Sequence, residues 1–277
     1  MERHIQQCEC FLRAARRRRI QFKLTKCQWA QLTIKLLGFE VGHGVRKVDP
    51  LKAKSLREWP EPASVDDVTS FLAFANFVRE FIPDFHEHAR WLRPLQKKGA
   101  KFKDLWTKET KDAFYALREA IASDAELHCP DWDAASDPES GRPFELYVDC
   151  SDFAWGAVLA QRSKKGGAPR PIAIFSKSLT ATEQAWSAFE RELFGIREAL
   201  ALAEPYIKGF KTVVLTDHKN NLFTGSLLAN RRVNKKLLRW AVDVEEWGDS
   251  IQRMWIKGKD HVLADPVSRN PVDRNYC

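Results

Sequence analysis

The order of apolar segments after residue 143 is the feature that most constrains the fold of this 277-residue chain. Three short, strand-like segments follow one another with turn-forming residues between them. A long amphipathic segment comes next, and further strand-like segments then alternate with helical ones. This order predicts an α/β fold in which helices flank a sheet. The strand-like segments are 143–151, 156–163, 169–179, 211–218 and 250–258, and the helical ones are 180–207, 234–246 and 264–270.

The half of the chain before residue 130 has a different pattern. Residues 2–18 predict a basic helix with one apolar face, and residues 21–44 show the short apolar runs and glycines of a strand or hairpin. The region 49–125 is helical in pattern throughout, with Asp49 as a candidate N-cap ahead of a proline. An acidic stretch rich in Pro, Ser and Gly, 130–143, predicts a linker or long loop between the two halves.

The composition excludes several classes of protein. No apolar run approaches the roughly 18 residues of a membrane span, and the N-terminal residues lack the apolar core of a secretory signal. Six scattered cysteines are too few for a disulfide scaffold, so reduced thiols in an intracellular setting are expected. The net charge of +8 favours a polyanionic partner without proving one. Most of that charge lies in residues 1–130, where 24 basic and 17 acidic side chains give +7.

Four acidic residues stand at the ends of the predicted elements, and they are the candidates for chemistry. Asp149 and Asp217 lie in the first and fourth strand-like segments, Glu192 in the long helix, and Asp265 at the start of the last helix. The apolar runs before Asp149, Asp217 and Asp265 place those carboxylates at the mouth of a buried scaffold, where like charges are costly unless a cation compensates them. Clustered oxygen ligands suit Mg²⁺ or Mn²⁺. Two such ions would activate a water and stabilise the leaving oxygen of a phosphodiester.

Each of these acids also has a purely structural interpretation. Asp217 and Asp265 fit ordinary helix or turn caps, and Glu192 fits a solvated helix position. Asp149 is the least easily dismissed because it lies inside an apolar strand. Taken singly, each acid fits a structural role better than a catalytic one. Only the order and context of the four together favour a catalytic role.

That order and context resemble a known family. Nearly end to end, the chain resembles the reverse transcriptase and ribonuclease H part of the polyprotein of Gypsy-type LTR retrotransposons. The stretches of the second half that carry the resemblance are YVDCSDFAWGAVLAQ, PIAIFSKSLTATEQAWSAFERELFGIREAL, VLTDHKNNLF and IKGKDHVLADPVSRN. Those of the first half are FKLTKCQWAQLTIKLLGFEVGHGV, VDPLKAKSLREWPEPASVDDVTSFLAFANFVREFIPDF and LWTKETKDAFYALREAI. Several independent motifs in one order argue against a chance match.

The resemblance implies a domain organisation. It implies a palm remnant with a primer-grip-like hairpin at 1–48, a helical thumb at 49–129 and a linker at 130–142. An RNase H-like domain, with a mixed five-stranded sheet flanked by helices, would occupy 143–277. The polymerase requires a strand-turn with adjacent aspartates upstream, and no such motif precedes the hairpin here. We therefore expect no polymerase active site, and we expect the missing fingers and palm portion of the polymerase as a partner.

The resemblance also implies an activity, the cleavage of the RNA strand of an RNA–DNA hybrid to leave 5′-phosphate and 3′-hydroxyl ends. Asp149, Glu192, Asp217 and Asp265 would be both the catalytic and the metal-binding residues. They would hold two Mg²⁺ ions, for which Mn²⁺ can substitute. In this scheme Asp149 bridges both ions, Glu192 and Asp217 complete one site, and Asp265 completes the other.

Cationic side chains are the candidates for holding the hybrid, because phosphate contacts supply most of the affinity. One group lies late in the chain and the other in the thumb-like segment. They are Arg231, Arg232, Lys235, Lys236 and Arg239, and Lys52, Lys54 and Arg57. Trp240, beside the first group, is favoured as a core residue over a stacking residue. For any single charge run, a solvated helix face is an equal alternative.

Other functions are also compatible with the sequence. The chain could be a catalytically inactive remnant that only binds hybrid or duplex, although the retention of all four acids argues against this. Zinc binding by His4, Cys8, Cys10 and Cys27 is a weak alternative, because no second C-x-x-C pair appears. His261 could assist product release, although an ordinary loop histidine is favoured.

Overall fold

The computed structural model describes residues 2–23, 25, 27–82, 85–121, 126–218 and 234–257. The chain divides into two units, residues 1–34 and residues 35–277, each described by itself. Among the described residues, no helix is long and apolar enough to cross a bilayer.

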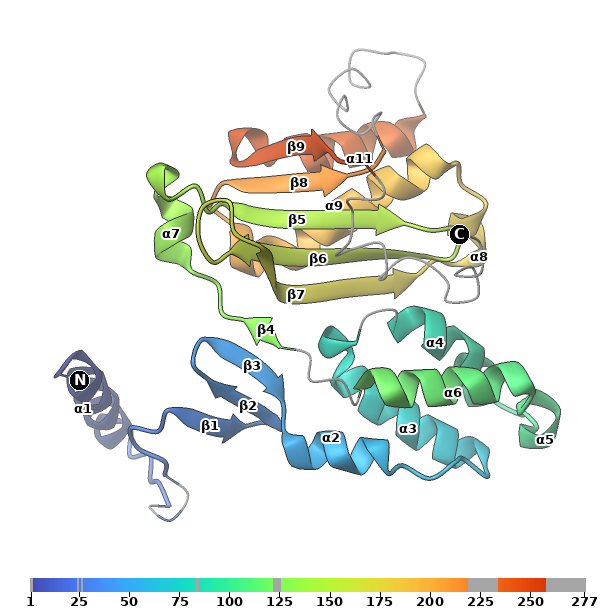
Figure 1. The fold of residues 1–277 in the computed structure, drawn as a ribbon, viewed down its shortest axis with the longest axis horizontal. Helices are drawn as coiled ribbons and strands as arrows, with labels where there is room; N and C mark the ends of the chain where they lie inside the picture. Colours follow the sequence, from blue (N-terminus) through green and yellow to red (C-terminus); the bar gives the residue numbers. More distant parts are fainter. Residues whose placement is uncertain are drawn as a thin grey trace. The chain divides into compact units, whose positions relative to one another are not determined.

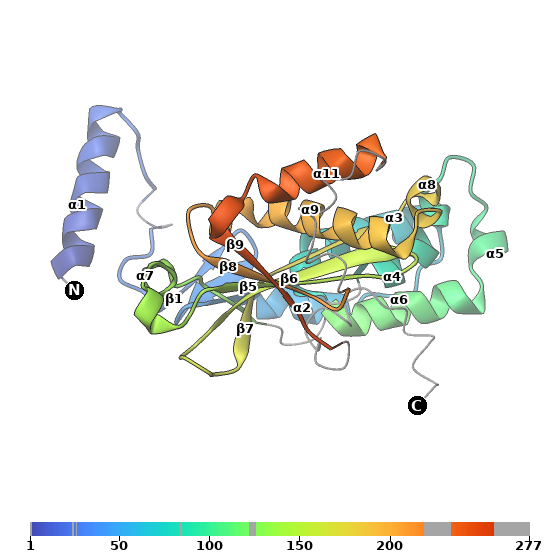
Figure 2. The same ribbon diagram turned by 90° about the horizontal axis from the view of Figure 1, so that it is seen from above.

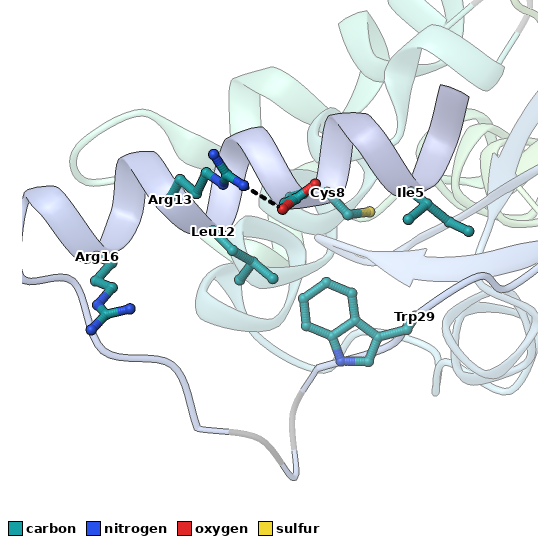
Figure 3. Close-up of a pocket in the computed structure, with 7 residues that line it drawn as sticks. Ile5, Cys8, Leu12, Arg13, Arg16 and Trp29 are labelled. Carbon is teal, nitrogen blue, oxygen red and sulfur yellow. Dashed lines mark hydrogen bonds and ion pairs between the residues drawn. The ribbon is translucent and has the colours of Figure 1, made fainter. Parts of the chain in front are cut away.

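The first unit contains α1 (Glu2–Arg17), the basic helix that the sequence predicts. One side of α1 is apolar, and Ile5, Cys8 and Leu12 line a groove together with Trp29 of the following segment (Figure 3). Ile5 and Leu12 nevertheless stay 58% and 40% exposed. The apolar side of α1 is therefore only partly covered by the described residues of its own unit.

A small sheet follows, in the strand order β1-β2-β3-β4 (Figure 1). Its strands are β1 (Thr33–Leu36), β2 (Phe39–Gly42), β3 (Val45–Val48) and β4 (Leu127–His128). Two-residue turns, Leu37–Gly38 and His43–Gly44, join the first three strands, and all four turn residues have positive φ. This left-handed backbone is typical of the tightest hairpin turns, whose second position favours glycine. The hairpin pattern predicted up to residue 44 therefore continues to residue 48.

A helical segment lies between β3 and β4, as the sequence predicts. Its helices are α2 (Pro50–Arg57), α3 (Val65–Phe77), α4 (Phe85–Leu92), α5 (Phe102–Leu105) and α6 (Lys108–Ile121), with 3₁₀ turns η2 (Arg79–Phe81) and η3 (Arg93–Gln96). Asp49 caps α2, because its side chain accepts a hydrogen bond from the backbone N–H of Leu51. Phe71 and Phe114 are fully buried in the shared core, with ring centroids 4.6 Å apart. This aromatic core joins α3 to α6.

The stretch predicted as a linker is partly helical. It contains α7 (Trp132–Ser136) and the 3₁₀ turn η4 (Pro138–Ser140). The Asp131 carboxylate accepts a hydrogen bond from the N–H of Ala134. The side-chain amide of Gln161 accepts a hydrogen bond from the backbone N–H of Asp131 and donates one to its carbonyl oxygen. The acidic and hydroxyl residues that predict a loop are thus also residues that cap short helices.

The second half forms a mixed five-stranded sheet in the order β7-β6-β5-β8-β9 (Figure 1). Its strands are β5 (Phe144–Cys150), β6 (Ala154–Arg162), β7 (Pro169–Ser178), β8 (Thr212–Thr216) and β9 (Ile251–Trp255), the five that the sequence predicts. β6 is antiparallel to β5 and β7, whereas β8 is parallel to β5 and β9. The strands β5, β7, β8 and β9 therefore all end at one edge, which we call the carboxyl edge.

Helices cover one face of this sheet, as Figure 2 shows for α9 (Ala188–Ile207) and α11 (Lys235–Glu245). The region predicted as one helix, 180–207, is two: the short α8 (Ala181–Gln184) precedes α9. Thr180 and Ser187 each form a capping box, with Glu183 and Glu190 respectively. The second box satisfies the first backbone N–H groups of α9, so the helix starts afresh there.

Candidate metal centre

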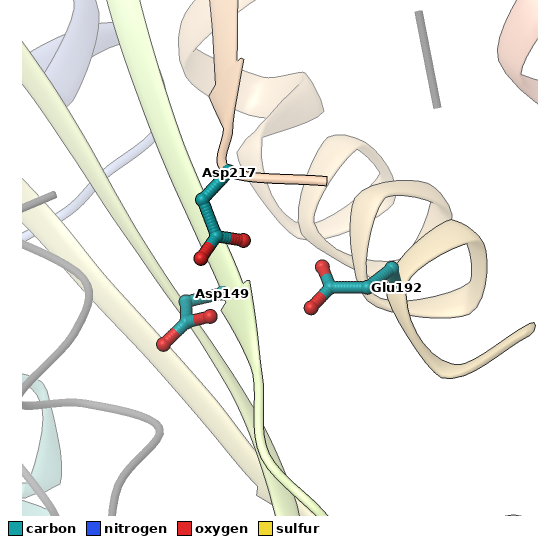
Figure 4. Close-up of side chains that lie close together, drawn as sticks. All are labelled: Asp149, Glu192 and Asp217. Carbon is teal, nitrogen blue, oxygen red and sulfur yellow. The ribbon is translucent and has the colours of Figure 1, made fainter. Parts of the chain in front are cut away.

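Three of the four predicted acids lie together at the carboxyl edge (Figure 4). Asp149 is near the end of β5, Asp217 directly follows β8, and Glu192 projects from the second turn of α9. One carboxylate oxygen from each lies within 4.8 Å of the others. Within the described ranges this is the only group of three or more His, Cys, Asp or Glu side chains close enough to share a metal ion. The predicted fourth acid, Asp265, lies outside the described residues.

Close packing of α9 against the sheet places Glu192 over the end of β5. Gly195, three residues further along α9, faces the sheet. A Cβ atom built at Gly195 would lie 3.4 Å from Cβ of Trp155 and 3.6 Å from Cγ1 of Val148. Both of these residues are fully buried. Both distances are ordinary van der Waals distances, so α9 packs closely against β5 and β6 at Gly195.

The backbone around Asp217 is fixed by neighbouring strands. The carbonyl oxygen of Asp217 accepts a hydrogen bond from the indole N–H of Trp255 at 2.8 Å. The hydroxyl of Thr216 accepts one from the N–H of His218, and its carbonyl accepts one from the N–H of Ile256. The Asp217 carboxylate points toward Asp149 and Glu192 (Figure 4). Its position is therefore set by backbone contacts that do not use the carboxylate.

Glu192 is the least solvated member of the cluster. Its side chain is almost fully buried, and Oε2 has no hydrogen-bond partner among the described residues. Burial raises the pKa of Glu192 well above its ordinary value of 4.5, and the charges of Asp149 and Asp217 raise it further. An unpaired, buried carboxylate oxygen beside two more carboxylates is the donor set that a hard divalent cation fits. The three residues present are therefore suited to bind Mg²⁺ or Mn²⁺.

Arg191, which the sequence reasoning did not include, ties the loop after β5 to α9. Its guanidinium forms an ion pair with Asp152 and donates a hydrogen bond to the carbonyl of Trp186. Its charge also lowers the pKa of Glu192, against the larger effects that raise it. The only sequence signal for this role was the position of Arg191 directly before Glu192.

Lys236 has intramolecular partners for its charge. Its ammonium nitrogen lies 4.1 Å from the ring centroid of Trp186 and 4.9 Å from that of Trp240, and it pairs with Glu190 at 2.8 Å. These contacts hold α11 against α9, so Lys236 is less available to a phosphate than its sequence position suggested. Trp240 is 3% exposed and packs in the core, as favoured from the sequence.

The other predicted cations differ in exposure. Lys52 is half-buried, with its ammonium nitrogen 4.6 Å from the ring centroid of Phe77. The exposed members are Lys54, Arg57, Lys235 and Arg239. Arg231 and Arg232 lie outside the described residues, as does His261. The four residues of the zinc alternative do not form a metal-binding group: Cys8 contacts His4 at 3.6 Å, but no third member joins them.

Comparison with known proteins shows the family of the chain. Residues 139–247 match the RNase H-like domain found in reverse transcriptase. Over 92% of its length the chain is 31% identical to the retrovirus-related Pol polyprotein from transposon opus of Drosophila melanogaster. Over 98% of its length it is 31% identical to the Pol polyprotein from transposon gypsy of the same organism. The chain belongs to the gypsy-type retrotransposon Pol family. It spans about a quarter of the length of these curated relatives.

Solved structures show the same architecture as this Pol-family chain. The foamy viral protease-reverse transcriptase in complex with RNA/DNA hybrid has a TM-score of 0.65 and 20% identity, covering 85% of this chain and 31% of that one. The same enzyme in complex with dsDNA has a TM-score of 0.64 and 21% identity, covering 82% of this chain and 45% of that one. At this identity the likeness concerns the fold. It confirms the predicted RNase H-like sheet preceded by a helical segment.

Proposed function

We propose that the domain formed by residues 143–277 cleaves the RNA strand of RNA–DNA hybrids during retrotransposon reverse transcription. The observation that carries this proposal is the cluster of Asp149, Glu192 and Asp217 at the carboxyl edge of an RNase H-like sheet. Two of these side chains are buried, and like charges at such short separations are costly without a cation. A divalent-metal nuclease site accounts for this costly arrangement.

Asp149, Glu192 and Asp217 would hold the metal, with Asp265 as the proposed fourth ligand. When bound, divalent ions favour ionisation of an attacking water and stabilise the negative charge that develops on the leaving oxygen of a phosphodiester. Asp149, with a carboxylate oxygen within 4.8 Å of those of Glu192 and Asp217, would be the ligand that the two ions share. The carboxylates would position the ions, and the burial of Glu192 would limit the access of bulk water to its carboxylate.

The remaining domain assignments are proposals of the same kind. Residues 1–48 would be a palm remnant, residues 49–129 a thumb and residues 130–142 a linker. The long overlap with a reverse transcriptase solved on RNA/DNA hybrid supports this division. The proposed partners are the RNA–DNA hybrid and the fingers and palm portion of the polymerase.

Exposed cations would hold the hybrid through its phosphates. The described candidates that keep exposed side chains are Lys54, Arg57, Lys235 and Arg239. Affinity should then fall with added salt, by roughly 0.7–0.9 units of log K per unit of log salt for each phosphate neutralised. A hybrid exposes 2′-hydroxyls on one strand only, which allows the strands to be distinguished.

The test is a cleavage assay on a hybrid whose RNA strand carries a 5′ label. We expect cleavage in Mg²⁺ or Mn²⁺, none in EDTA, and products with 3′-hydroxyl ends. Asp149→Asn should reduce the rate by more than about 100-fold, because even indirect partners of metal ligands contribute 10- to 100-fold. Asp133→Asn is the matched control, since Asp133 is an exposed aspartate of α7 outside the cluster.

Undiminished cleavage by Asp149→Asn would overturn the assignment of the site. Salt-sensitive binding of hybrid by the wild-type protein without any cleavage would instead identify a binding protein that has lost its activity. The two outcomes are distinguishable because binding is measured in EDTA and cleavage in Mg²⁺ on the same labelled hybrid.

A further inference from the structure

A cationic and aromatic surface lies where α4 meets the loop after β5. The guanidinium carbon of Arg90 lies 4.5 Å from the ring centroid of Phe153 and 5.2 Å from that of Trp91. Phe153 is 41% exposed and Trp91 37% exposed, although both are large apolar side chains. Arg90 is thus flanked by two aromatic rings that solvent still reaches. We call Arg90, Trp91 and Phe153 the arginine–aromatic surface.

The loop that carries Phe153 is held firmly. The hydroxyl of Ser151 accepts hydrogen bonds from the N–H groups of Phe153 and Ala154, at 3.3 Å and 3.1 Å. The carbonyl of Phe153 accepts a third from the N–H of Leu179 at 2.7 Å. With the Asp152 ion pair described above, these contacts fix the backbone on both sides of Phe153. The exposed ring of Phe153 is therefore held in place by a well-bonded loop, and its exposure is a fixed feature of the surface.

This surface lies at the same edge of the sheet as the carboxylate cluster. The guanidinium of Arg93 and the imidazole of His86 both contact the hydroxyl of Ser178, which ends β7 at the carboxyl edge. These contacts anchor α4 to that edge. β7 is two strands from β5 in the sheet order, and neighbouring strands are about 4.8 Å apart. The anchoring point of α4 is therefore on the order of 10 Å from the strand that carries Asp149.

The charge of Arg90 is incompletely satisfied within the described residues. Its acidic neighbour Glu87 lies 3.5 Å away, and neither oxygen of Glu87 makes a hydrogen bond. The Glu87 side chain is buried, which raises its pKa and makes it a poor counter-ion. Stacking on aromatic rings orients the planar guanidinium without using its N–H donors. Donors of Arg90 thus remain for an anionic ligand from solvent.

We propose that the arginine–aromatic surface is a second contact for the nucleic-acid duplex, in which Arg90 binds a backbone phosphate and the rings of Trp91 and Phe153 pack against the adjoining sugars. This inference rests on the proposed function, since the duplex is the RNA–DNA hybrid. The anchoring point of α4 lies on the order of 10 Å from the strand that carries Asp149, a span of about three base-pair steps at 3.4 Å of rise each. A hybrid whose RNA strand lies in the carboxylate cluster is long enough to reach both places.

The test measures hybrid affinity in EDTA as a function of salt, by fluorescence anisotropy with the full chain. Arg90→Gln should weaken binding by roughly 10-fold and lower the slope of log K against log salt by about one, as expected for one lost phosphate contact. Arg90→Lys should keep the slope, because the charge remains. Phe153→Leu should weaken binding and leave the slope unchanged, because an apolar contact releases no counter-ions.

Arg118→Gln is the matched control. The guanidinium carbon of Arg118 also lies near two aromatic rings, 4.7 Å from Tyr115 and 5.8 Å from Phe114, but within the helical segment. Its loss removes the same kind of stacked arginine away from the carboxyl edge. We expect its affinity and salt slope to equal those of the wild-type protein, with urea unfolding showing that every variant is folded.

The test distinguishes a failure of this inference from a failure of the proposed function. If the wild-type protein binds and cuts hybrid while Arg90→Gln retains its affinity and salt slope, the arginine–aromatic surface is only a tie between α4 and the loop, and this inference is overturned alone. If both Arg90 variants lose stability without a change in salt slope, the conclusion is the same. If the wild-type protein neither binds nor cuts hybrid, this inference and the proposed function fall together.

Discussion

Replacement of Glu192 by glutamine is expected to stabilise the protein when divalent ions are absent. The Glu192 carboxylate is buried, and oxygens of Asp149 and Asp217 lie within 4.8 Å of it. At that separation and an effective dielectric constant of about 20, each pair of unit charges repels by roughly 3 kcal/mol. Burial, together with these two charges, raises the pKa of Glu192. Both effects oppose a charged carboxylate at this position.

Proton uptake by Glu192 limits how far its charge can destabilise the native state. At pH 7, protonating a carboxyl group whose ordinary pKa is 4.5 costs about 3.4 kcal/mol, at 1.36 kcal/mol per pH unit. Glu192 takes up a proton once the repulsion exceeds this amount, so it destabilises the native state by about 3 kcal/mol at most. We therefore expect Glu192→Gln to raise the free energy of unfolding by about 1–3 kcal/mol at pH 7.

The pH dependence of the wild-type protein has a definite sign. Because the native pKa of Glu192 is raised, its favourable contribution is complete below the unfolded value near 4.5. That contribution is lost as the pH rises through the raised native pKa. The glutamine variant does not titrate at this position and should not show the loss. The difference in unfolding free energy between Glu192→Gln and the wild-type protein should thus increase from pH 4.5 toward neutral pH.

Urea unfolding in EDTA and in Mg²⁺ is the assay. Ions that bind the folded state at ten times their dissociation constant stabilise it by about 1.4 kcal/mol. The wild-type protein should gain this stability from Mg²⁺, and Glu192→Gln should gain less. Glu204→Gln is the matched control on α9, because Glu204 is a surface residue paired with Lys208 and its loss should change stability by less than about 1 kcal/mol.

Two results would refute this reasoning. One is a Glu192→Gln protein that is less stable than wild type in EDTA at pH 7. The other is an equal Mg²⁺ stabilisation of both proteins, which would show that Glu192 does not contribute to the metal site.

Three further predictions concern stability. Ser187→Ala removes the capping box of α9 and should lower the free energy of unfolding by about 1 kcal/mol in urea titrations; no change would mean that the box does not determine where α9 starts. Burial, reinforced by the charge of Arg93, lowers the pKa of His86 from 6.5 to about 4. Stability should therefore be full above pH 6.5 and fall by up to about 3 kcal/mol as the pH drops toward 4, and an equal fall in His86→Gln would contradict this cause. Phe114→Ala empties a fully buried site and should cost about 3–5 kcal/mol, measured by thermal or urea unfolding; a loss below 1 kcal/mol would indicate that the core collapses around it.

The sequence predicted the secondary structure well where local patterns decide it. The five strands were predictable because each is a short apolar run bounded by turn residues. The helix predicted at 180–207 is divided because Ser187 and Glu190 form a second capping box, a pattern that the sequence already contains. The short helices within 130–143 were not predicted, because their capping residues are also typical of loops.

The candidate site was predictable only in part. Asp149 and Asp217 were selected by the apolar runs before them and Glu192 by the family resemblance of its helix, and the fold brings those three together. Lys236 was selected by its place in a cationic cluster, yet it stacks on Trp186 and Trp240. A charge pattern along the chain does not show which aromatic side chains a cation will meet after folding.

The sequence by itself determined which segments are strands and helices, which face of each is apolar, and where the acidic residues stand at their ends. Only the tertiary structure decided that β5 lies between β6 and β8, and that α9 packs closely at Gly195. Only it showed that Arg90 of α4 reaches Phe153 of the loop after β5. The physical reason is that periodicity and capping act between near neighbours in the chain, whereas strand order and packing join residues far apart in sequence.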